Sequence, residues 1–435
     1  MLTKTITRLD VPGPKARDLL ARDRKVVSHA YGRVADFVME RGLGTEVWDV
    51  DGNEYIEYGM GLRSVVLGHA YAPVVEAAYK AMQRGSNFTR PAAIEVEAAE
   101  TLLAMIQGAE MVKFAKNGSD VTTAALKLAR ACTGRTLVAI CGDQPFFSVD
   151  DWFIGSTAMP GGVPEAIRSQ TLKFRYNDLA SLAALFDVYP EQIACVFLEA
   201  ETTTPPTPGY LQAVVDLCHH HGALFVLDEM ITGFRWHNGG AQTLYGITPD
   251  LSTFGKGIGN GFAVSALVGK AAIMERGGLQ QDKDRVFLLS TTHGAETHSL
   301  AAAIATMRTY QEQDVIGQLH RQGERLACGV RQAAADLGIG DYFEVAGRAS
   351  NLIFVTRDAN KNRSQPFRTL FMQEMIRRGV LGPSFVISYA HADADVDRTI
   401  EAAAAALRVY CRALEAGVEQ YLVGRPVKPV FRPKN

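Results

Sequence analysis

A single lysine set among glycines is the feature of this sequence that most directly indicates chemistry. Lys256 follows the apolar run 251–254 and lies in the segment 255–261, Gly-Lys-Gly-Ile-Gly-Asn-Gly. Glycine-rich backbone lets another group approach closely. A lysine that loses solvation there has a lowered pKa and becomes a nucleophile. The same pattern also fits a flexible loop that carries a solvated lysine.

A carboxylate ends another apolar run. Asp228 follows the five apolar residues 223–227, which predict a buried strand. A carboxylate in that position is partly desolvated and stays ionised only beside a cation. A helix cap or a structural ion pair would explain the same residue.

A glycine-containing turn supplies a third group. The apolar run 111–114 leads into a turn in which Gly118 permits tight geometry and Ser119 can cap the following helix. The first N–H groups and the dipole of such a helix attract a phosphate. An ordinary capped turn is the alternative.

Lys256, Asp228 and the turn at Gly118 belong together if the ligand is pyridoxal phosphate. That cofactor needs a lysine for a Schiff base, a carboxylate to keep its pyridine nitrogen protonated, and a cradle for its phosphate. Each group follows an apolar run, and open α/β sheets bind ligands beyond the carboxyl ends of their strands. The sequence therefore predicts a pyridoxal-phosphate site at one edge of a sheet.

The elements that must position these groups are indicated by short apolar runs that alternate with helical patterns. The alternation predicts an α/β fold, with a mostly parallel sheet and helices on both faces. The predicted strands are 111–114, 136–141, 195–198, 223–227, 251–254 and 265–268, and the predicted helices are 121–131, 179–186, 210–220 and 299–310.

Both ends of the chain predict a smaller α+β domain. Residues 46–58 alternate around Asp51-Gly52, which predicts a hairpin because Gly52 tolerates the positive φ of a type I′ turn. We expect an N-terminal segment 1–60 within the small domain, a large cofactor-binding domain 61–312 and a C-terminal small domain 313–435. The last has predicted helices 315–337, 368–378 and 396–414, and strands 351–355 and 385–387.

Composition excludes several classes of protein. Of 435 residues, 47% are apolar, and 45 Lys and Arg nearly balance 47 Asp and Glu, for a net charge of −2. This favours a globular chain without a general nucleic-acid-binding surface. No apolar run approaches the ~18 residues of a membrane span, and the start lacks a signal-peptide core. Six cysteines without a Cys-x-x-Cys pair predict buried free thiols in a cytoplasmic protein.

As a set, the motifs resemble the class III, fold-type I pyridoxal-phosphate aminotransferases, and within them the branch of glutamate-1-semialdehyde 2,1-aminomutase. The resemblance spans roughly residues 25–415. It rests on the segments 48–55 (Trp-Asp-Val-Asp-Gly-Asn-Glu-Tyr), 67–69 (Leu-Gly-His), 117–120, 128–135, 228–235 (Asp-Glu-Met-Ile-Thr-Gly-Phe-Arg) and 253–256 (Thr-Phe-Gly-Lys).

The resemblance implies a role for each matched residue. Lys256 would form the Schiff base with the cofactor and move the proton. Asp228 would pair with the pyridinium nitrogen. Gly118 and Ser119 would bind the phosphate, with Asp120 beside them at the start of the helix.

The resemblance also implies a homodimer with shared active sites. Thr292 matches the family threonine that reaches the phosphate of the neighbouring subunit, and Glu199 matches a glutamate near the cofactor ring. Where the family usually has Tyr-His-Gly, this chain has Phe-Phe-Ser, so Phe146 would stack on the cofactor without a phenol. Residues 381–385 (Leu-Gly-Pro-Ser-Phe) lack the carboxylate that true aminomutases carry there.

Three further residues are candidates for substrate contacts. Arg63 and Arg90 lie in segments that line the mouth of the site in relatives, and either could clamp a carboxylate or phosphate bidentately or be a surface arginine. His293 either reaches the site beside Thr292 or simply packs. The run 219–221 of three histidines ends a predicted helix, where we expect interaction with the dipole and no metal.

The leading expectation is a transaminase that moves an amino group from an amino acid, with glutamate as the expected donor, to an aldehyde or ketone. Sugar-related aminotransferases are the leading group by resemblance, because the aminomutase carboxylate is missing. The first alternative is the aminomutase itself. The second is a catalytically silent protein that binds pyridoxal phosphate, against which Lys256 and Asp228 argue.

Overall fold

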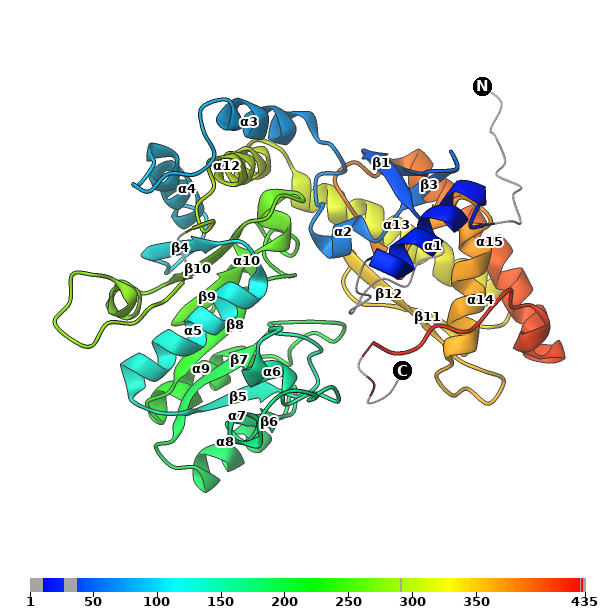
Figure 1. Ribbon diagram of the computed structural model, residues 1–435. Coiled ribbons are helices and arrows are strands. Elements are labelled where there is room, and N and C mark those ends of the chain that lie inside the picture. Colours follow the sequence, from blue (N-terminus) through cyan, green and yellow to red (C-terminus); the bar gives the residue numbers. More distant parts are fainter. Residues whose placement is uncertain (1–10, 27–36, 290–291, 431, 433–435) are drawn as a thin grey trace. The chain divides into compact units, whose positions relative to one another are not determined.

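The computed structural model describes residues 11–26, 37–289, 292–430 and 432, which form two compact units (Figure 1). The small unit comprises the described residues of Met1–Leu62, Leu67–Tyr71 and Gly317–Arg432. The large unit comprises those of Arg63–Val66 and Ala72–Ile316. Among the described residues, no helix combines the length and the apolar character needed to cross a membrane.

The large unit is built on a sheet that has seven strands within the described part of the chain (Figure 1). Strands β5 to β9 pair in parallel, whereas β10 is antiparallel to both β4 and β9. All strands except β10 therefore have their carboxyl ends at one edge. The order is β4 (Met111–Ala115), β10 (Ser265–Gly269), β9 (Leu251–Phe254), β8 (Leu224–Asp228), β7 (Ile193–Leu198), β5 (Leu137–Cys141) and β6 (Thr171–Phe174).

The predicted α/β fold with a mostly parallel sheet is confirmed, although strand β6 was not predicted. Within the described ranges, strand β6 pairs with β5 alone, and three of its four residues are half-buried or exposed. An edge strand needs no continuous apolar run, so its sequence, Thr-Leu-Lys-Phe, carries little strand signal.

Helices cover both faces of this sheet because its central strands are apolar on both sides. Along β5, Val138 and Ile140 pack into the core that includes α5, whereas Ala139 and Cys141 pack into the core beneath α8 and α9. The helices of the large unit are α3 (Ala72–Met82), α4 (Ala93–Leu103), α5 (Gly118–Thr133), α6 (Asp151–Ile154), α7 (Glu165–Arg168), α8 (Leu179–Val188), α9 (Tyr210–His220), α10 (Gly240–Tyr245), α11 (Ala271–Met274) and α12 (Thr297–Glu312), with 3-10 turns at Lys256–Gly259 and Glu275–Gly277.

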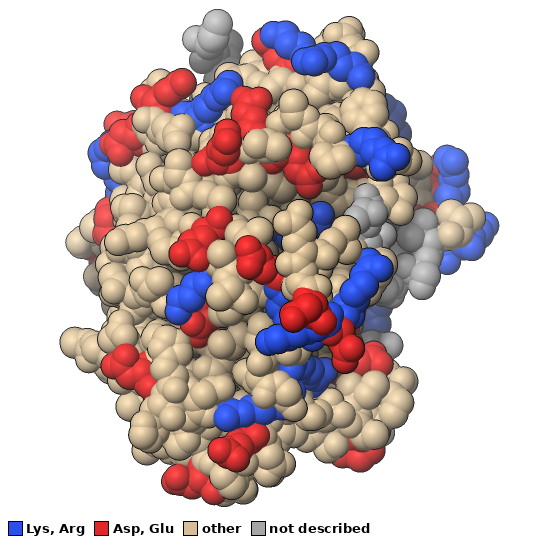
Figure 2. Space-filling view, turned by 90° about the vertical axis from the view of Figure 1, so that its left-hand side faces the viewer, with Lys and Arg blue, Asp and Glu red and all other residues tan. Residues whose placement is uncertain are grey.

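Charges of both signs are spread over the surface of the molecule that Figure 2 shows. Lys and Arg alternate there with Asp and Glu, and no patch of a single sign covers this face. This distribution agrees with the nearly balanced composition.

The small unit contains two sheets. One has the order β1 (Met39–Leu43), β2 (Glu46–Asp49), β3 (Glu54–Glu57) and β13 (Val380–Leu381), with β13 parallel to β3. The other has the order β11 (Phe343–Ala346), β12 (Asn351–Thr356) and β14 (Phe385–Val386). The accompanying helices are α1 (Pro14–Val26), α13 (Val315–Asp336), α14 (Gln365–Ile376) and α15 (Asp393–Ala416), followed by a 3-10 turn at Val418–Gln420.

The hairpin of β2 and β3 forms as predicted, but its turn is not type I′. A type I′ turn needs positive φ at both central residues, and of Asp51 and Gly52 only Gly52 has one, at 86°. The Asp49 carboxylate accepts hydrogen bonds from the N–H groups of Asp51 and Asn53 at 3.0 and 2.8 Å. These side-chain bonds fix a four-residue loop instead.

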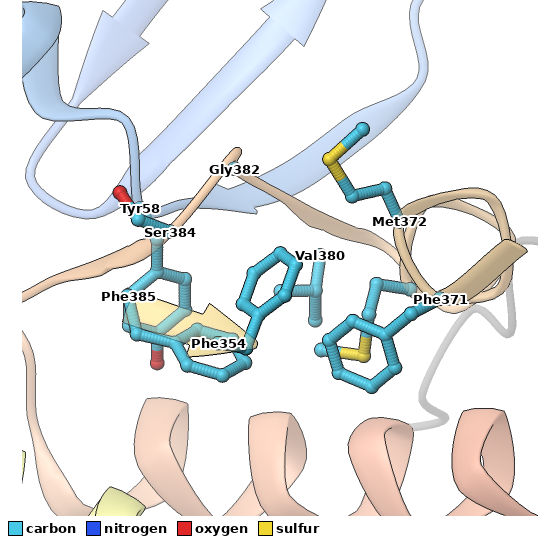
Figure 3. Close-up of a pocket in the computed structure, with 9 residues that line it drawn as sticks. Tyr58, Phe354, Phe371, Met372, Val380, Gly382, Ser384 and Phe385 are labelled. Atoms are coloured by element: carbon cyan, nitrogen blue, oxygen red, sulfur yellow. The ribbon is translucent and has the colours of Figure 1, made fainter. Parts of the chain in front are cut away.

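The pocket in Figure 3 lies in the core of the small unit. Phe354 packs with Phe371 and Phe385 at ring-centroid distances of 4.9 and 5.4 Å. The Tyr58 hydroxyl donates to Thr399 Oγ1 at 2.8 Å. The lining residues carry no carboxylate, imidazole or amine, so this pocket is a place of apolar packing and not of acid–base chemistry.

The expectation of six buried thiols is wrong for three of them. Cys141, Cys195 and Cys218 are buried, whereas Cys132 and Cys328 are exposed and Cys411 is half-buried. The last three lie on the long helices α5, α13 and α15, each of which presents one face to solvent. All six thiols are free.

Candidate active site

The candidate residues converge at the carboxyl edge of the large sheet. Asp228 ends β8, directly opposite Thr253 of the neighbouring strand β9, and Lys256 follows β9 after one glycine. Glu199 follows β7 on the other side of β8. The turn that contains Gly118 follows β4, which is separated from β9 only by β10. Sheet topology thus brings together residues that are up to 138 positions apart in sequence.

Two glycines make room for Lys256 in a strained backbone. A Cβ at Gly255 would lie 2.6 Å from Met230 Sδ, and a Cβ at Gly257 would lie 2.7 Å from Val66 Cγ2. Lys256 itself has a φ of 44°, a left-handed conformation that costs an L-residue roughly 1–2 kcal/mol. Such strain persists where surrounding packing holds it, as at functional sites.

The charges around Lys256 favour a reactive amine. Burial lowers its pKa, the negative charges of Asp228 and Glu199 oppose that effect, and the positive charges of Arg63 and Arg235 add to it. Within the described part of the chain, the amine makes no hydrogen bond or ion pair. A half-buried lysine with a lowered pKa has a larger neutral fraction, which is the nucleophilic form.

Asp228 is held by one carboxylate oxygen. Its Oδ1 accepts hydrogen bonds from Met230 N at 2.9 Å and from Thr253 Oγ1 at 3.2 Å. Burial raises its pKa to about 6, while the charge of Lys256 and these hydrogen bonds oppose the rise. Its Oδ2 has no hydrogen-bond partner among the described residues. That oxygen is available to a cationic N–H of a ligand.

The turn before α5 presents donors to an anion. Asn117 and Asp120 form a capping box, in which Asp120 N donates to Asn117 Oδ1 at 3.2 Å and Asn117 N donates to Asp120 Oδ2 at 3.3 Å. The N–H groups of Gly118 and Ser119 find no acceptor in the described ranges. Ser119 Oγ accepts from Val149 N at 2.9 Å, which leaves its proton to donate. Asp120 shapes the turn, and three donors at the start of a 16-residue helix suit a phosphate.

Glu199 is a buried carboxyl whose backbone is firmly fixed. The side-chain amide of Gln144 accepts a hydrogen bond from Glu199 N at 2.8 Å and donates one to Glu199 O at 2.6 Å. Burial and then the negative charge of Asp228 raise the pKa of Glu199 to about 8, against the charges of Lys256 and Arg63. This carboxyl is therefore mostly neutral near pH 7.

Phe146 lies in a loop that is tied to the start of α5. Thr122 Oγ1 donates to the carbonyl of Phe147 at 2.9 Å. Phe146 is 38% exposed and meets Phe153 edge to face at 5.6 Å. The ring is therefore partly open to solvent, and its stacking on the cofactor stays a prediction.

Thr292 and His293 lie before α12. The carbonyl of Thr292 accepts a hydrogen bond from Asn87, and both Thr292 and His293 are exposed. His293 Nδ1 bonds Glu296 Oε1 at 2.8 Å, and Glu296 also pairs with Lys116 beside the phosphate turn. The structure shows His293 as an exposed side chain with a polar partner, and its contact with the substrate stays a prediction.

The two candidate arginines, Arg63 and Arg90, differ in exposure and in their interaction with the candidate site. Arg63 is half-buried, and its charge acts on both Lys256 and Glu199. Arg90 is exposed between α3 and α4, and among the described residues no hydrogen bond or ion pair joins it to Lys256 or Glu199. Sequence reasoning missed Arg235, which is 1% exposed and donates from Nη2 to the carbonyl of Arg63 at 3.2 Å. The signal that could have identified this residue is its place in the sequence, where a charged side chain stands between Phe234 and Trp236.

Comparisons with known proteins agree with this site. The family Aminotransferase class-III matches residues 26–381. Glutamate-1-semialdehyde 2,1-aminomutase 2 of Bacillus cereus (strain B4264) is 33% identical over 392 residues, which cover 85% of this chain and 90% of the relative.

Solved structures show the same fold. The FumI protein of Sphingopyxis sp. MTA144, in its PLP internal aldimine form, matches with a TM-score of 0.83 and 27% identity over 93% of this chain and 98% of that one. An omega-transaminase from Sphaerobacter thermophilus matches with a TM-score of 0.82 and 24% identity over 92% and 98% of the two chains.

Proposed function

The chain belongs to the class-III aminotransferases, and from this premise we propose that it is a transaminase with an amino acid donor, expected to be glutamate, and an aldehyde or ketone acceptor. The observation that carries the proposal is the Lys256 amine, which lies in a strained glycine-flanked turn beside Asp228 and Glu199. A sugar-related acceptor is the first class to test, on the resemblance described above.

The cofactor is pyridoxal phosphate. When bound, it supplies an aldehyde for an amine and a ring that withdraws electrons from the substrate. We propose that Lys256 Nζ binds that aldehyde and later accepts and returns the substrate's Cα proton. Its lowered pKa suits both tasks, because proton transfer is most efficient when the pKa lies near the working pH.

The other residues hold the cofactor in place. Asp228 Oδ2 is free to accept the ring N–H and keep it protonated, while Oδ1 stays anchored to Met230 and Thr253. The N–H groups of Gly118 and Ser119 would bind the phosphate. The donors and the carboxylate lie at the same sheet edge as Lys256, and the residues present therefore fit this cofactor.

The second candidate is glutamate-1-semialdehyde 2,1-aminomutase, which the 33% identical relative favours. Residues 381–385 contain no carboxylate, and Phe146 stands where the family resemblance expects a tyrosine. Both departures favour a transaminase whose pocket accepts a different carbonyl compound.

We also propose that the active enzyme is a homodimer. Val75, Tyr79 and Met82 are 43%, 58% and 46% exposed and follow each other at helical spacing on one face of α3. The helices α3 and α4 both pack against α12 (Figure 1). The buried residues of α3 are Val74 and Ala78, so the apolar residues at 75, 79 and 82 lie on a face that is open to solvent. Thr292 precedes α12 in the same region, where a partner could receive its hydroxyl. We expect the dimer to be cytoplasmic.

A single experiment separates the candidates. Purified holoenzyme mixed with glutamate alone should release one 2-oxoglutarate per site and then stop until an acceptor is added. It should not convert glutamate-1-semialdehyde to 5-aminolevulinate. Efficient 5-aminolevulinate formation would reverse the ranking. If neither reaction occurs, a screen of other amino donors distinguishes a different donor from a silent cofactor-binding protein.

A further inference from the structure

The segment 146–152, which follows strand β5, is bonded to the first turns of α5. Thr122 Oγ1 donates to the carbonyl of Phe147 at 2.9 Å, and the backbone N–H of Val149 donates to Ser119 Oγ at 2.9 Å. Helix α5 begins at the turn that offers N–H groups to an anion. The segment and the start of this helix therefore hold each other in place.

Four side chains form a hydrogen-bonded network where this segment meets the helix. Thr123 Oγ1 of α5 accepts a hydrogen bond from Trp152 Nε1 at 2.8 Å and donates to Asp150 Oδ2. The same oxygen lies 3.4 Å from Ser148 Oγ, which accepts a hydrogen bond from Asp150 N at 3.1 Å. Ser148 and Trp152 are 0% and 5% exposed, so much of the network is shielded from water.

The chemistry of these groups fixes the direction of each hydrogen bond. An indole N–H can only donate, and a carboxylate can only accept. Thr123 therefore accepts from Trp152 and gives its own proton to Asp150. Ser148 faces the Thr123 oxygen after that proton is committed, so Ser148 is the donor of this pair. The network thus has a single arrangement of protons, which the carboxylate and the indole impose.

The backbone that this network fixes is the backbone that orients the hydroxyl of Ser119. Asp150 N is bonded to the side chain of Ser148, and Val149 N, between these two residues, is bonded to Ser119 Oγ. Because Ser119 Oγ accepts this hydrogen bond, its own proton is left to donate to another group. Ser119 is 8% exposed and is the second residue of α5, where a phosphate would meet that proton.

We propose that Asp150 is a positioning residue for the phosphate of the cofactor. Through Thr123 and Ser148 it fixes the backbone that orients the Ser119 hydroxyl, and this hydroxyl donates to the phosphate. The inference rests on the proposed function in taking the turn before α5 as the phosphate site. Ser148 stands where the family resemblance expects a glycine. Because glycine has no hydroxyl, the complete network is a feature of this chain.

The test compares the affinity of the full-length apoenzyme for pyridoxal phosphate with its affinity for pyridoxal, which carries no phosphate. Asp150→Ala removes the acceptor of Thr123. It should weaken binding of pyridoxal phosphate about 3- to 10-fold, the range expected for one hydrogen bond, and leave the affinity for pyridoxal unchanged. Asp150→Asn keeps an acceptor oxygen and should restore most of the loss. Asp151→Ala removes the neighbouring, exposed carboxylate; it is the matched control and should bind both compounds normally.

A double variant shows whether Asp150 acts through Ser119. Ser119→Ala should weaken binding of pyridoxal phosphate about 10-fold or more, and adding Asp150→Ala should weaken it no further. The phosphorus NMR signal of the bound cofactor is an independent readout. It should shift in Asp150→Ala in the same direction as in Ser119→Ala, and it should stay in place in Asp151→Ala.

Three results would overturn the proposal. They are equal losses of affinity for pyridoxal and pyridoxal phosphate in Asp150→Ala, additive losses in the double variant, and normal binding of pyridoxal phosphate in Asp150→Ala. Thr123→Val breaks the same network from the side of the helix, and it takes the place of Asp150→Ala in each comparison if that variant does not fold. Failure of the proposed function would show separately, because the unmodified apoenzyme would then bind pyridoxal phosphate no more tightly than pyridoxal.

Discussion

The hydrogen bonds of Asp228 indicate how this carboxylate would hold the cofactor. Two hydrogen bonds hold one oxygen, and the other oxygen is open. Replacing Asp228 by Asn keeps the shape but removes the charge that keeps a bound ring nitrogen protonated. We expect kcat to fall by about 10²-fold or more, equivalent to about 2.7 kcal/mol of barrier.

Thr253→Val is the matched control for this carboxylate. It removes only the 3.2 Å hydrogen bond to Oδ1, a change of about 0.5–1.5 kcal/mol, and should slow the enzyme by less than Asp228→Asn. Steady-state kinetics of the two variants provide the comparison. Activity close to that of the unmodified enzyme in Asp228→Asn would assign the role to another carboxyl, and Glu199, whose charge also acts on Lys256, would be the first candidate.

The raised pKa of Glu199 predicts that the absorbance of the bound cofactor depends on pH. Burial and the charge of Asp228 raise its pKa to about 8, so this acid is protonated below that pH and ionised above it. In the holoenzyme, where Lys256 Nζ is bonded to the cofactor, ionisation adds a negative charge beside that nitrogen and favours its protonated form. The absorbance of the bound cofactor should therefore change as the pH rises through about 8, and Glu199→Gln should abolish that change. A transition that persists in the variant would assign it to another group.

Single residues could be predicted where their position follows from a strand end. Lys256 and Asp228 each follow an apolar run, so the sequence placed them at the sheet edge. Arg235 was missed because its burial depends on where the distant segment Arg63–Val66 packs. Only non-local packing makes that guanidinium part of the site.

Helix α5 begins at the turn that we propose binds the phosphate of the cofactor. Gly118 is its first residue, and an added Cβ would approach Met230 Sδ to 3.0 Å. We expect Gly118→Ala to displace the turn and weaken the affinity of the apoenzyme for pyridoxal phosphate by about 10-fold, which is 1.4 kcal/mol. Titration of the apoenzyme with the cofactor measures this directly.

Gly134, at the other end of α5, is the control. It caps the helix with a φ of 70° and has open space around it. Gly134→Ala should lower the free energy of unfolding by about 1 kcal/mol and leave cofactor affinity unchanged. If both variants bound the cofactor normally, the turn at Gly118 would not be the phosphate site.

Among the elements, long periodic helices and buried strands could be predicted, and short or side-chain-stabilised elements could not. The helix α9 has the predicted bounds, because its apolar spacing and the following Gly222 define it. The turn at Gly52 and the edge strand β6 differ from prediction. The first depends on the Asp49 carboxylate, and the second on pairing along β5.

At the scale of the whole molecule, the proposed dimer can be tested through the apolar face of α3. Tyr79→Asp places a charge in the centre of that face, and burying an unpaired charge costs several kcal/mol. The dimer dissociation constant should rise by about 10²-fold or more, and activity should fall with the dimer fraction. Analytical ultracentrifugation of the holoenzyme measures the association.

Val188→Asp provides the comparison on another surface. Val188 is 66% exposed at the end of α8, away from the helices that flank Thr292, and this variant should remain dimeric and active. A Tyr79→Asp protein that stays dimeric with the same affinity would show that α3 is not the interface.

Family and fold class could be predicted from the sequence because motifs for lysine, carboxylate and phosphate turn occur together along one α/β pattern. The division of the chain into compact units, in contrast, depends on contacts between segments that are distant in sequence. The contacts group Leu67–Tyr71 with the small unit and Arg63–Val66 with the large one, an exchange that local sequence does not reveal. The expected domains 1–60, 61–312 and 313–435 stay a prediction.

The attachment of the cofactor to Lys256 is the central claim, and borohydride reduction of the holoenzyme followed by peptide mapping tests it most directly. Reduction makes the bond between the cofactor and its lysine permanent. The label should appear on the peptide that contains Lys256 and be absent from that position in Lys256→Ala. A label on another lysine, above all on Lys116 beside the phosphate turn, would contradict the assignment.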